Sequence, residues 1–130
     1  MRAGALALIA HDGRKEAMIA LAEEWRELLG QLDLVGTATT GTLVQNHTAL
    51  PVRRMLSGPL GGDLQIGALV ATGEIAAVIF LRDPLTAHPH DPDISALMKV
   101  CDTHNVPLAT NVATAQILLR DIARDPVPER

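Results

Sequence analysis

A glycine-rich stretch that ends in a carboxylate is the first place in this chain where residue types and spacing point to chemistry. Residues 57–63 read SGPLGGD, with glycine at three positions and Asp63 at the end. A glycine in ordered structure costs about 0.5–1 kcal/mol relative to alanine, so the stretch has to serve a local purpose. Glycines let a backbone approach a bound molecule closely, and a carboxylate held there can accept a proton. We therefore take this stretch as a candidate site.

A second stretch carries hydroxyl groups where a helix is expected to begin. Residues 37–42 read TATTGT, and no P-loop or GxGxxG motif occurs in the chain. Backbone N–H groups at a helix start lack intrahelical partners and lie at the positive end of the helix dipole, so they attract anions. Threonines also occur there as simple caps. The alternative to caps is a phosphate pocket formed by residues 37–42 and 57–62, with Lys15 supplying the positive charge.

A third stretch, HPHDPD at residues 88–93, has the residue types of a metal site. Histidine nitrogens and carboxylate oxygens are common zinc ligands. Two prolines lie between the candidate ligands, however, and spacing alone does not predict that His88, His90, Asp91 and Asp93 converge. A metal-dependent hydrolase is therefore one alternative, while the preferred interpretation contains no metal.

The elements that position these residues alternate along the chain. Apolar runs predict strands at residues 5–10, 32–38, 52–56, 76–81 and 106–110. Helical spacing predicts helices from Asp12 to Gly30 and at residues 41–47, 62–72, 93–105 and 113–123. Such alternation requires crossovers between parallel neighbours. We expect one α/β domain over residues 1–130: a three-layer, doubly wound, flavodoxin-like fold around a five-stranded, mostly parallel sheet.

Polar side chains follow the strands at one edge of this predicted sheet, where open α/β sheets bind ligands. His11 follows the first strand, and carboxylates gather nearby: Asp12, Asp63, Asp83, Asp91 and Asp93. Like charges raise some pKa values and hydrogen bonds lower others, which yields one base and supporting acids. A phosphate pocket, an imidazole and a positioned carboxylate together predict proton abstraction beside the carbonyl of a small phosphorylated substrate.

The composition excludes several other classes of protein. The 130 residues carry a formal net charge of −4, which argues against nucleic acid as the main partner. The single cysteine excludes an intramolecular disulfide and fits a reducing compartment. No apolar run approaches the roughly 18 residues of a membrane span, and the start of the chain lacks a signal-peptide pattern. We expect a cytoplasmic protein without a nucleic-acid or membrane partner.

Taken together, these motifs resemble those of the methylglyoxal synthases. The similarity covers nearly the whole chain, and its two longest motifs are the most specific. The motifs are HDGRK (11–15), TATTGTLVQ (37–45), MLSGPLGGDLQIGALV (55–70), PHDPD (89–93) and VPLATNVATAQ (106–116). The resemblance implies a cofactor-free homohexamer that converts dihydroxyacetone phosphate to methylglyoxal and inorganic phosphate. That phosphate is also a possible inhibitor.

The resemblance also implies roles for individual residues. Asp63 would be the catalytic base, with His90 and Asp93 completing the catalytic set. His11 would contact the substrate, and Asp12 and Asp83 would be supporting acids. The phosphate would lie against Lys15, Thr37, Thr39, Thr40, Ser57 and Gly58.

Two points leave the resemblance incomplete. Related domains serve as non-catalytic effector-binding modules in carbamoyl-phosphate synthetase, so an effector-binding domain is the runner-up interpretation. Asp63 and His90 distinguish the two, because a pure binding module needs neither. The family's longer C-terminal segment carries an arginine that reaches a neighbouring subunit's phosphate, and here only Arg120, Arg124 or Arg130 could replace it.

Overall fold

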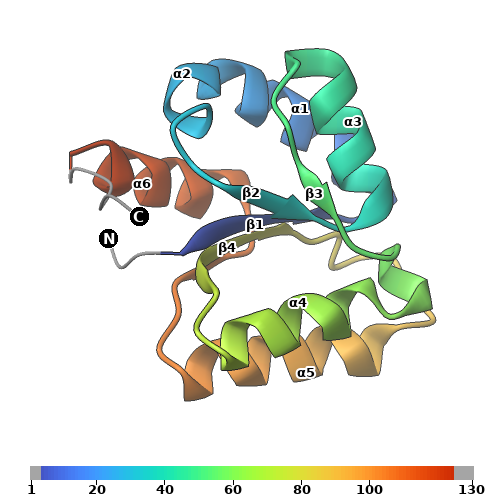
Figure 1. Cartoon of the computed structure of the whole chain (residues 1–130). Helices are drawn as coiled ribbons and strands as arrows, with labels where there is room; N and C mark the ends of the chain where they lie inside the picture. The colour runs from blue at the N-terminus through green and yellow to red at the C-terminus, as the bar shows by residue number, and fades with distance from the viewer. Residues whose placement is uncertain (1–3, 125–130) are drawn as a thin grey trace.

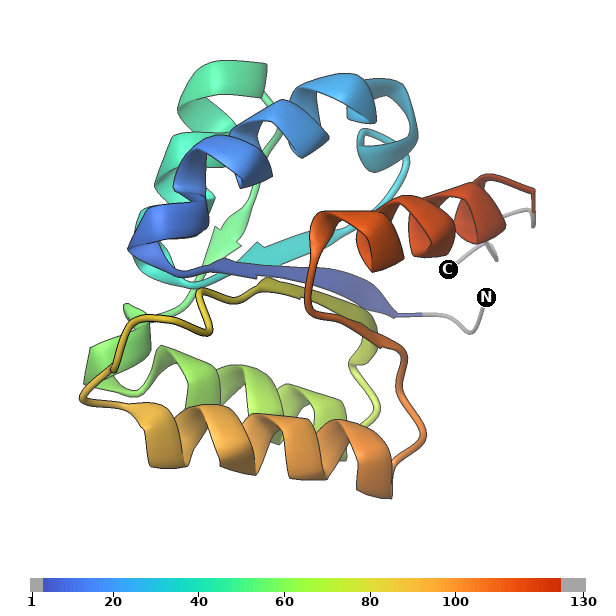
Figure 2. The ribbon, with the colours of Figure 1, turned by 180° about the vertical axis from the view of Figure 1, so that it is seen from behind.

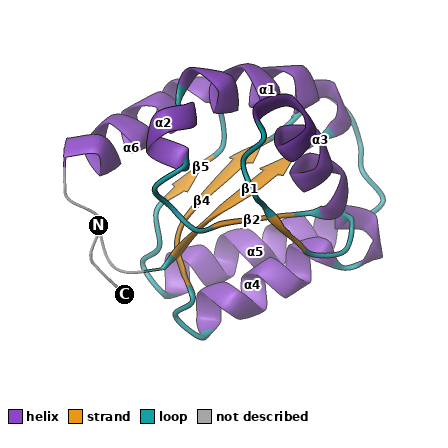
Figure 3. Cartoon of the chain, turned by 45° about the horizontal axis from the view of Figure 1, so that its top comes forward, coloured by secondary structure: helices purple, strands orange, loops and turns teal. Residues whose placement is uncertain are grey.

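A five-stranded parallel sheet forms the centre of the molecule. The computed structural model describes residues 4–124. Its strands are β1 (Ala5–Ala10), β2 (Leu34–Gly36), β3 (Arg53–Arg54), β4 (Ile75–Leu81) and β5 (Leu108–Ala109). They lie in the order β3-β2-β1-β4-β5, and every neighbouring pair is parallel. The arrows of β1, β4 and β5 point the same way in Figure 3.

Helices cover both faces of this sheet (Figures 1 and 2). One face carries α1 (Lys15–Glu24), α2 (Arg26–Leu29), α3 (Ala38–Thr48) and α6 (Val112–Arg124), and the other carries α4 (Gly62–Ala71) and α5 (Asp91–Thr103). Two 3₁₀ turns, Asp12–Arg14 and Gly58–Leu60, precede α1 and α4. None of the helices between residues 4 and 124 is both long enough and apolar enough to span a bilayer.

The central strands are buried on both faces, and alternate residues serve the two helical layers. Leu6, Leu8 and Ala10 of β1 pack in the core beneath α1, α3 and α6. Ala5, Ala7 and Ile9 pack in the opposite core, against α4 and α5. This alternation follows from the period of two in a strand, and it explains why β1 and β4 are continuous apolar runs.

The predicted fold class is confirmed, and the strand order refines it. The three layers and the parallel sheet are as expected, but a flavodoxin sheet has the order 2-1-3-4-5. Here β1, β2 and β3 extend to one side and β4 and β5 to the other, so the winding changes direction between β1 and β4. Ligands in open α/β sheets bind at that change of direction, beyond the carboxyl ends of the strands.

Several predicted boundaries were wrong. The helix expected from Asp12 to Gly30 is interrupted at Trp25, whose indole N–H donates to Gln116 Oε1 of α6 at 2.9 Å. The third strand contains only Arg53 and Arg54, which are exposed at the sheet edge. Two helices begin earlier than expected: α3 at residue 38 and α5 at residue 91. The threonine motif therefore lies at the start of α3, with Thr37 as the residue just before the helix, rather than in a preceding loop.

Candidate active site

A cavity of about 290 Å³ lies beyond the carboxyl ends of β1 and β2, beside the start of α4. Ligand pockets commonly occupy about 300–1,000 Å³, so this one suits a small molecule. Most of the residues singled out in the sequence line it: His11, Asp12, Lys15, Thr37, Thr39, Ser57, Gly58, Asp63 and His90. The remaining three, Thr40, Asp83 and Asp93, lie outside its lining.

Asp63 reaches the cavity because the glycines before it allow a turn that no other residue permits. Gly61 has φ +104°, in the left-handed region that favours glycine. A Cβ on Gly62 would lie 2.0 Å from the carbonyl oxygen of Leu56, a distance that no side chain tolerates. Asp63 follows as the second residue of α4, with a side chain that is 0 % exposed. The glycine-rich stretch thus buries a carboxylate at the edge of the cavity.

The buried carboxylate of Asp63 lies next to His90. Asp63 Oδ2 is 3.3 Å from His90 Nε2, and among residues 4–124 nothing donates a hydrogen bond to either carboxylate oxygen. A Cβ on Gly58 would lie 3.0 Å from His90 Nε2 and 3.4 Å from both oxygens of Asp63. Gly58 therefore leaves room at the point where this pair faces the cavity.

Burial makes Asp63 a stronger base than an ordinary aspartate. It is the largest cause that raises the pKa of Asp63, and the negative charge of Asp93 acts in the same direction. His90 and Lys15 oppose the shift without reversing it. A helix N-terminus by itself favours the carboxylate anion, which would make a weak base. At this site the loss of water outweighs the charges that stabilise the anion.

His11 lines the cavity as a neutral imidazole, and one of its ring nitrogens has no hydrogen-bond partner among the described residues. Its Nδ1 accepts a 2.8 Å hydrogen bond from the backbone N–H of Asp83. Burial, followed by the nearby His88 and His90, lowers the pKa of His11 to about 4. Because Nδ1 is an acceptor, the hydrogen bond assigns the proton to Nε2. That atom is buried without a partner among the described residues, so it is a donor available to a ligand.

The hydroxyl groups at the two helix starts do not act as caps. Neither Thr37 at α3 nor Ser57 at the following 3₁₀ turn makes a side-chain capping hydrogen bond. The hydroxyl of Thr37 lies 3.3 Å from that of Thr40. The cap interpretation of Thr37 and Ser57 is therefore wrong, and both side chains line the cavity beside the first turn of α3.

Lys15 and Thr40 form one hydrogen-bonded unit at the wall of this pocket. Lys15 Nζ donates to the carbonyl oxygen of Ala10 and, at 2.8 Å, to Thr40 Oγ1. Thr40 also accepts the backbone N–H of Ala10 at 3.2 Å. Burial lowers the pKa of Lys15, and the carboxylates of Asp12 and Asp63 oppose that shift. Thr40 thus positions the lysine, which itself lines the cavity.

The other predicted acids occupy different positions. Asp83 accepts hydrogen bonds from Leu85 N–H at 3.2 Å and from the Thr86 hydroxyl at 2.8 Å. The Thr86 bond is the main cause of its lowered pKa, so this carboxylate stabilises a turn while its backbone N–H supports His11. Asp93, in the first turn of α5, acts on Asp63 through its charge. Asp12 is exposed at the rim of the cavity.

The residues of the HPHDPD motif do not assemble a metal site. His88 stacks on the ring of His11, with ring centroids 3.7 Å apart. The carboxylate of Asp91 accepts the backbone N–H of His88 at 3.5 Å. Across residues 4–124, no three His, Cys, Asp or Glu side chains are grouped so that they could hold a metal ion. The metal-dependent hydrolase alternative therefore lacks a ligand set in this part of the chain.

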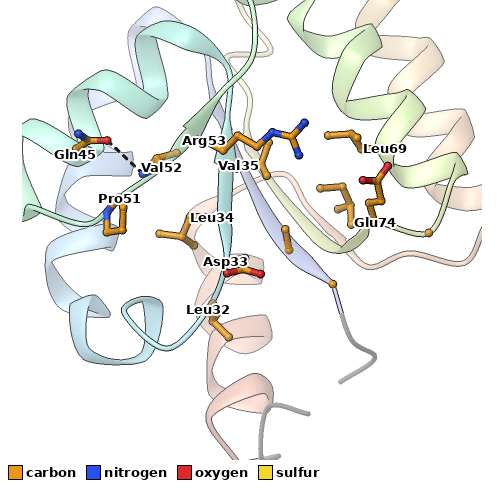
Figure 4. Close-up of a pocket in the computed structure, with 14 residues that line it drawn as sticks. Leu32, Asp33, Leu34, Val35, Gln45, Pro51, Val52, Arg53, Leu69 and Glu74 are labelled. Atoms are coloured by element: carbon orange, nitrogen blue, oxygen red, sulfur yellow. Dashed lines mark hydrogen bonds between the residues drawn. The ribbon is translucent and has the colours of Figure 1, made fainter. Parts of the chain in front are cut away.

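A larger cavity lies at the opposite end of the sheet and lacks these features. It has about 730 Å³ and is lined by the loops before β2, β3 and β4 (Figure 4). Its charged side chains are Asp33, Arg53 and Glu74, and Gln45 accepts the backbone N–H of Val52 at its margin. It contains none of the residues predicted for the site, so size does not identify the functional cavity here.

Comparison with known proteins agrees with this geometry. A family model described as MGS-like domain matches residues 17–110. A methylglyoxal synthase of Burkholderia multivorans (strain ATCC 17616 / 249) is 60% identical over 119 residues, covering 92% of both chains. This chain belongs to the methylglyoxal synthase family. The protein of that name from Burkholderia cenocepacia (strain HI2424) is 59% identical over 120 residues, again covering 92% of each chain.

A solved structure extends the comparison to the fold. The crystal structure of methylglyoxal synthase from Elizabethkingia anophelis NUHP1 matches with a TM-score of 0.87 and 35% sequence identity. The match covers 98% of this chain and 87% of that one. The resemblance predicted from the sequence is thus confirmed. The lyase interpretation is supported over the non-catalytic effector-binding alternative. The relatives are named as methylglyoxal synthases, and the similarity covers 92% of each of them.

One ionisable residue of the cavity was not predicted as part of a methylglyoxal synthase site. His88 lines the cavity beside His11 and His90, yet its only expected role was as a metal ligand. Its position two residues before His90, separated by Pro89, was the available signal. The pattern did not predict stacking, because the partner His11 lies far away in the sequence.

Proposed function

We propose that this protein converts dihydroxyacetone phosphate to methylglyoxal and inorganic phosphate, and that Asp63, His90 and Asp93 are its catalytic residues. One observation carries the proposal: the unpartnered, buried carboxylate of Asp63 shares a cavity with His90 and with the neutral, donating His11. Such an arrangement suits the removal of a proton from carbon next to a carbonyl group.

The phosphate group would bind at the start of α3. In the first helical turn the N–H of Ala38 donates to the carbonyl oxygen of Leu56 at 3.3 Å, whereas those of Thr39 and Thr40 have no intrahelical carbonyl to bond and would be the phosphate donors. Lys15 would supply the positive charge, held in place by Thr40. Thr39 and Gly58 would complete the pocket, with Gly58 allowing close approach of the backbone. Asp12 at the rim and Asp83 behind His11 would support the site.

Asp63 would then take a proton from the hydroxymethyl carbon of the substrate. The electron pair of that C–H bond forms a C=C bond, and the carbonyl oxygen gains negative charge. The Nε2–H of His11 and the ring of His90 would stabilise this oxygen, since hydrogen-bond donors fixed in a water-poor site stabilise developing charge effectively. Asp93 would help by raising the basicity of Asp63.

The enediolate would lose phosphate rather than isomerise. When the C–O bond to phosphate stands perpendicular to the enediolate plane, its antibonding orbital overlaps the π system and the bond breaks. The electron pair of the C–O bond leaves with the phosphate, and the hydroxyl proton on the former hydroxymethyl carbon passes to the phosphate as that carbon becomes the aldehyde. The remaining enolate takes up a proton at its methylene carbon to become methylglyoxal, while Asp63 releases the proton that it took. Donors at the start of α3 would hold the perpendicular pose and stabilise the leaving group.

We also propose the setting of this reaction. Residues 1–130 would act as one methylglyoxal synthase-like domain within a homohexamer, without a cofactor. The protein would work in the cytoplasm, a location that fits its free, buried thiol at Cys101. Arg120 and Arg124 each make a local contact, to Gln116 and Asp121 respectively, and Arg130 lies outside the described residues.

The proposal is tested by supplying dihydroxyacetone phosphate and measuring methylglyoxal and phosphate together, with and without EDTA. We expect equal amounts of the two products and no effect of the chelator. Tight binding of the substrate without turnover would favour the effector-binding alternative, and loss of activity in EDTA would favour a metal-dependent hydrolase.

A further inference from the structure

His88 covers one face of the His11 ring. The two ring centroids are 3.7 Å apart and the ring planes are inclined by 23°, so the rings are stacked. Phe80 also contacts His11, with the two rings edge-on and their centroids 5.1 Å apart. His88 also lies edge-on to His90, with centroids 5.7 Å apart. The ring of His88 therefore belongs to a cluster of three imidazoles, in which His11 and His90 also meet edge-on with centroids 5.9 Å apart.

Asp83 links the two stacked rings through its backbone. Its N–H donates to His11 Nδ1 at 2.8 Å, and its carbonyl oxygen lies 3.4 Å from His88 Nε2. The backbone N–H of His88 points at the carboxylate of Asp91, 3.5 Å away. These contacts hold both rings with respect to Asp83, which lies in the loop after β4. The position of His88 is thus set by that loop and by the first residue of α5.

We propose that His88 is a positioning residue for the lyase reaction, whose ring keeps His11 neutral and its Nε2–H directed at the substrate oxygen. The inference rests on the proposed role of His11 in that reaction. A stacked ring excludes water from one face of His11 and limits its rotation. A second imidazole at this distance also opposes an additional positive charge on the pair.

The charged groups around the pair act in both directions. His88, His90 and Arg82 lower the pKa of His11, and Asp83 raises it. Asp91 lies on the backbone side of His88. Burial remains the largest cause of the shift, and part of that burial comes from the His88 ring itself. Removing the ring therefore admits water and relieves repulsion, and both changes favour protonation of His11.

The test compares His88→Ala and His88→Phe, with His104→Ala as the control. His104 is an exposed histidine at the end of α5. Nitrogen-15 NMR of the histidine rings reports the tautomer and the titration of His11 without reference to activity. In His88→Ala we expect the pKa of His11 to rise by about one unit or more from its value near 4. In His88→Phe, which retains a covering ring, we expect a smaller rise.

Steady-state kinetics provide the second readout. His88→Ala should lower kcat about tenfold and leave KM within about twofold, because His11 orients the substrate oxygen during chemistry. His88→Phe should recover most of kcat, and circular dichroism should show all variants folded. An unchanged His11 titration together with an unchanged kcat in His88→Ala would overturn the inference. Inactivity of the wild-type protein on dihydroxyacetone phosphate would instead count against the proposed function, since the NMR result stands on its own.

Discussion

Asp63 Oδ2 lies 3.3 Å from His90 Nε2 at the edge of a small cavity, and the two side chains are 0 % and 9 % exposed. This contact places an imidazole against a carboxylate that is buried and accepts no hydrogen bond from residues 4–124. A buried carboxylate usually accepts hydrogen bonds, and a buried carboxylate without donors destabilises the folded state. The cost is consistent with a functional role, because the free oxygens remain available to a proton on carbon.

Asp63→Asn should stabilise the fold. Burial raises the pKa of Asp63, so the folded state disfavours the ionised carboxylate relative to the unfolded state. This cost is absent at pH values below the ordinary aspartate pKa and grows as the pH rises through the raised one. At pH 7 the neutral amide should therefore raise Tm by several degrees, as scanning calorimetry will measure. A Tm advantage that does not shrink at acid pH would contradict this account.

Asp93→Asn should move the acid limb of the kcat profile to lower pH. The charge of Asp93 raises the pKa of Asp63, and a base works only in its deprotonated form. Activity is lost as the pH falls through the pKa of Asp63, so lowering that pKa extends activity into acid. Asp102→Asn, an exposed change later in α5, is the matched control and should leave the profile in place. An acid limb that stays at the same pH in Asp93→Asn would show that the charge of Asp93 does not affect the pKa of Asp63.

Gly58→Ala should lower activity far more than stability. Its Cβ would lie 3.0 Å from His90 Nε2 and 3.4 Å from the Asp63 oxygens, so it intrudes on the proposed reacting groups. We expect kcat to fall at least about tenfold, as misplacement of catalytic groups commonly does. Gly73→Ala is the opposite control: its φ of +82° costs about 1–2 kcal/mol for alanine, yet nothing lies within 4 Å of the added Cβ. Equal activity losses in the two variants would show that Gly58 matters only for folding.

Lys15→Met should weaken the binding of phosphate and of substrate. Lys15 Nζ donates hydrogen bonds to Thr40 and to the carbonyl oxygen of Ala10 at the wall of the cavity. Lys15 is the one lysine or arginine among the described residues that line this cavity. Removing one charge-assisted contact should raise KM, and the inhibition constant for inorganic phosphate, about tenfold or more. Thr40→Val should produce a smaller change in the same direction, because it removes the hydroxyl that positions the amine. Lys99→Met on the exposed side of α5 should change neither constant.

The fold was largely predictable, because burial imposes strong patterns on sequence. The runs at residues 5–10 and 76–81 have no polar residue, as strands covered on both faces require. The edge strands β3 and β5 contain two residues each, and their limits depend on pairing that the local sequence does not encode. The position of Asp63 could also be anticipated, since Gly61 and Gly62 are needed for geometric reasons that act locally.

The electrostatic state of the site could not be predicted, because it arises between residues distant in sequence. The tautomer of His11 depends on the backbone N–H of Asp83, and the basicity of Asp63 depends on how completely the fold removes water. Asp83 looked like a supporting acid, but its amide contributes more directly to the site than its carboxylate does. The sequence shows a histidine at position 88, but it does not predict that this ring stacks on His11.

The central claim is that Asp63 removes the proton that begins the reaction. The most direct measurement is the rate of methylglyoxal and phosphate formation from dihydroxyacetone phosphate by wild type and Asp63→Asn, with both shown to be folded. The account predicts equimolar products from wild type and a loss of at least about 10³-fold in kcat for the variant. Near-wild-type turnover by Asp63→Asn, or phosphate released without methylglyoxal, would contradict it.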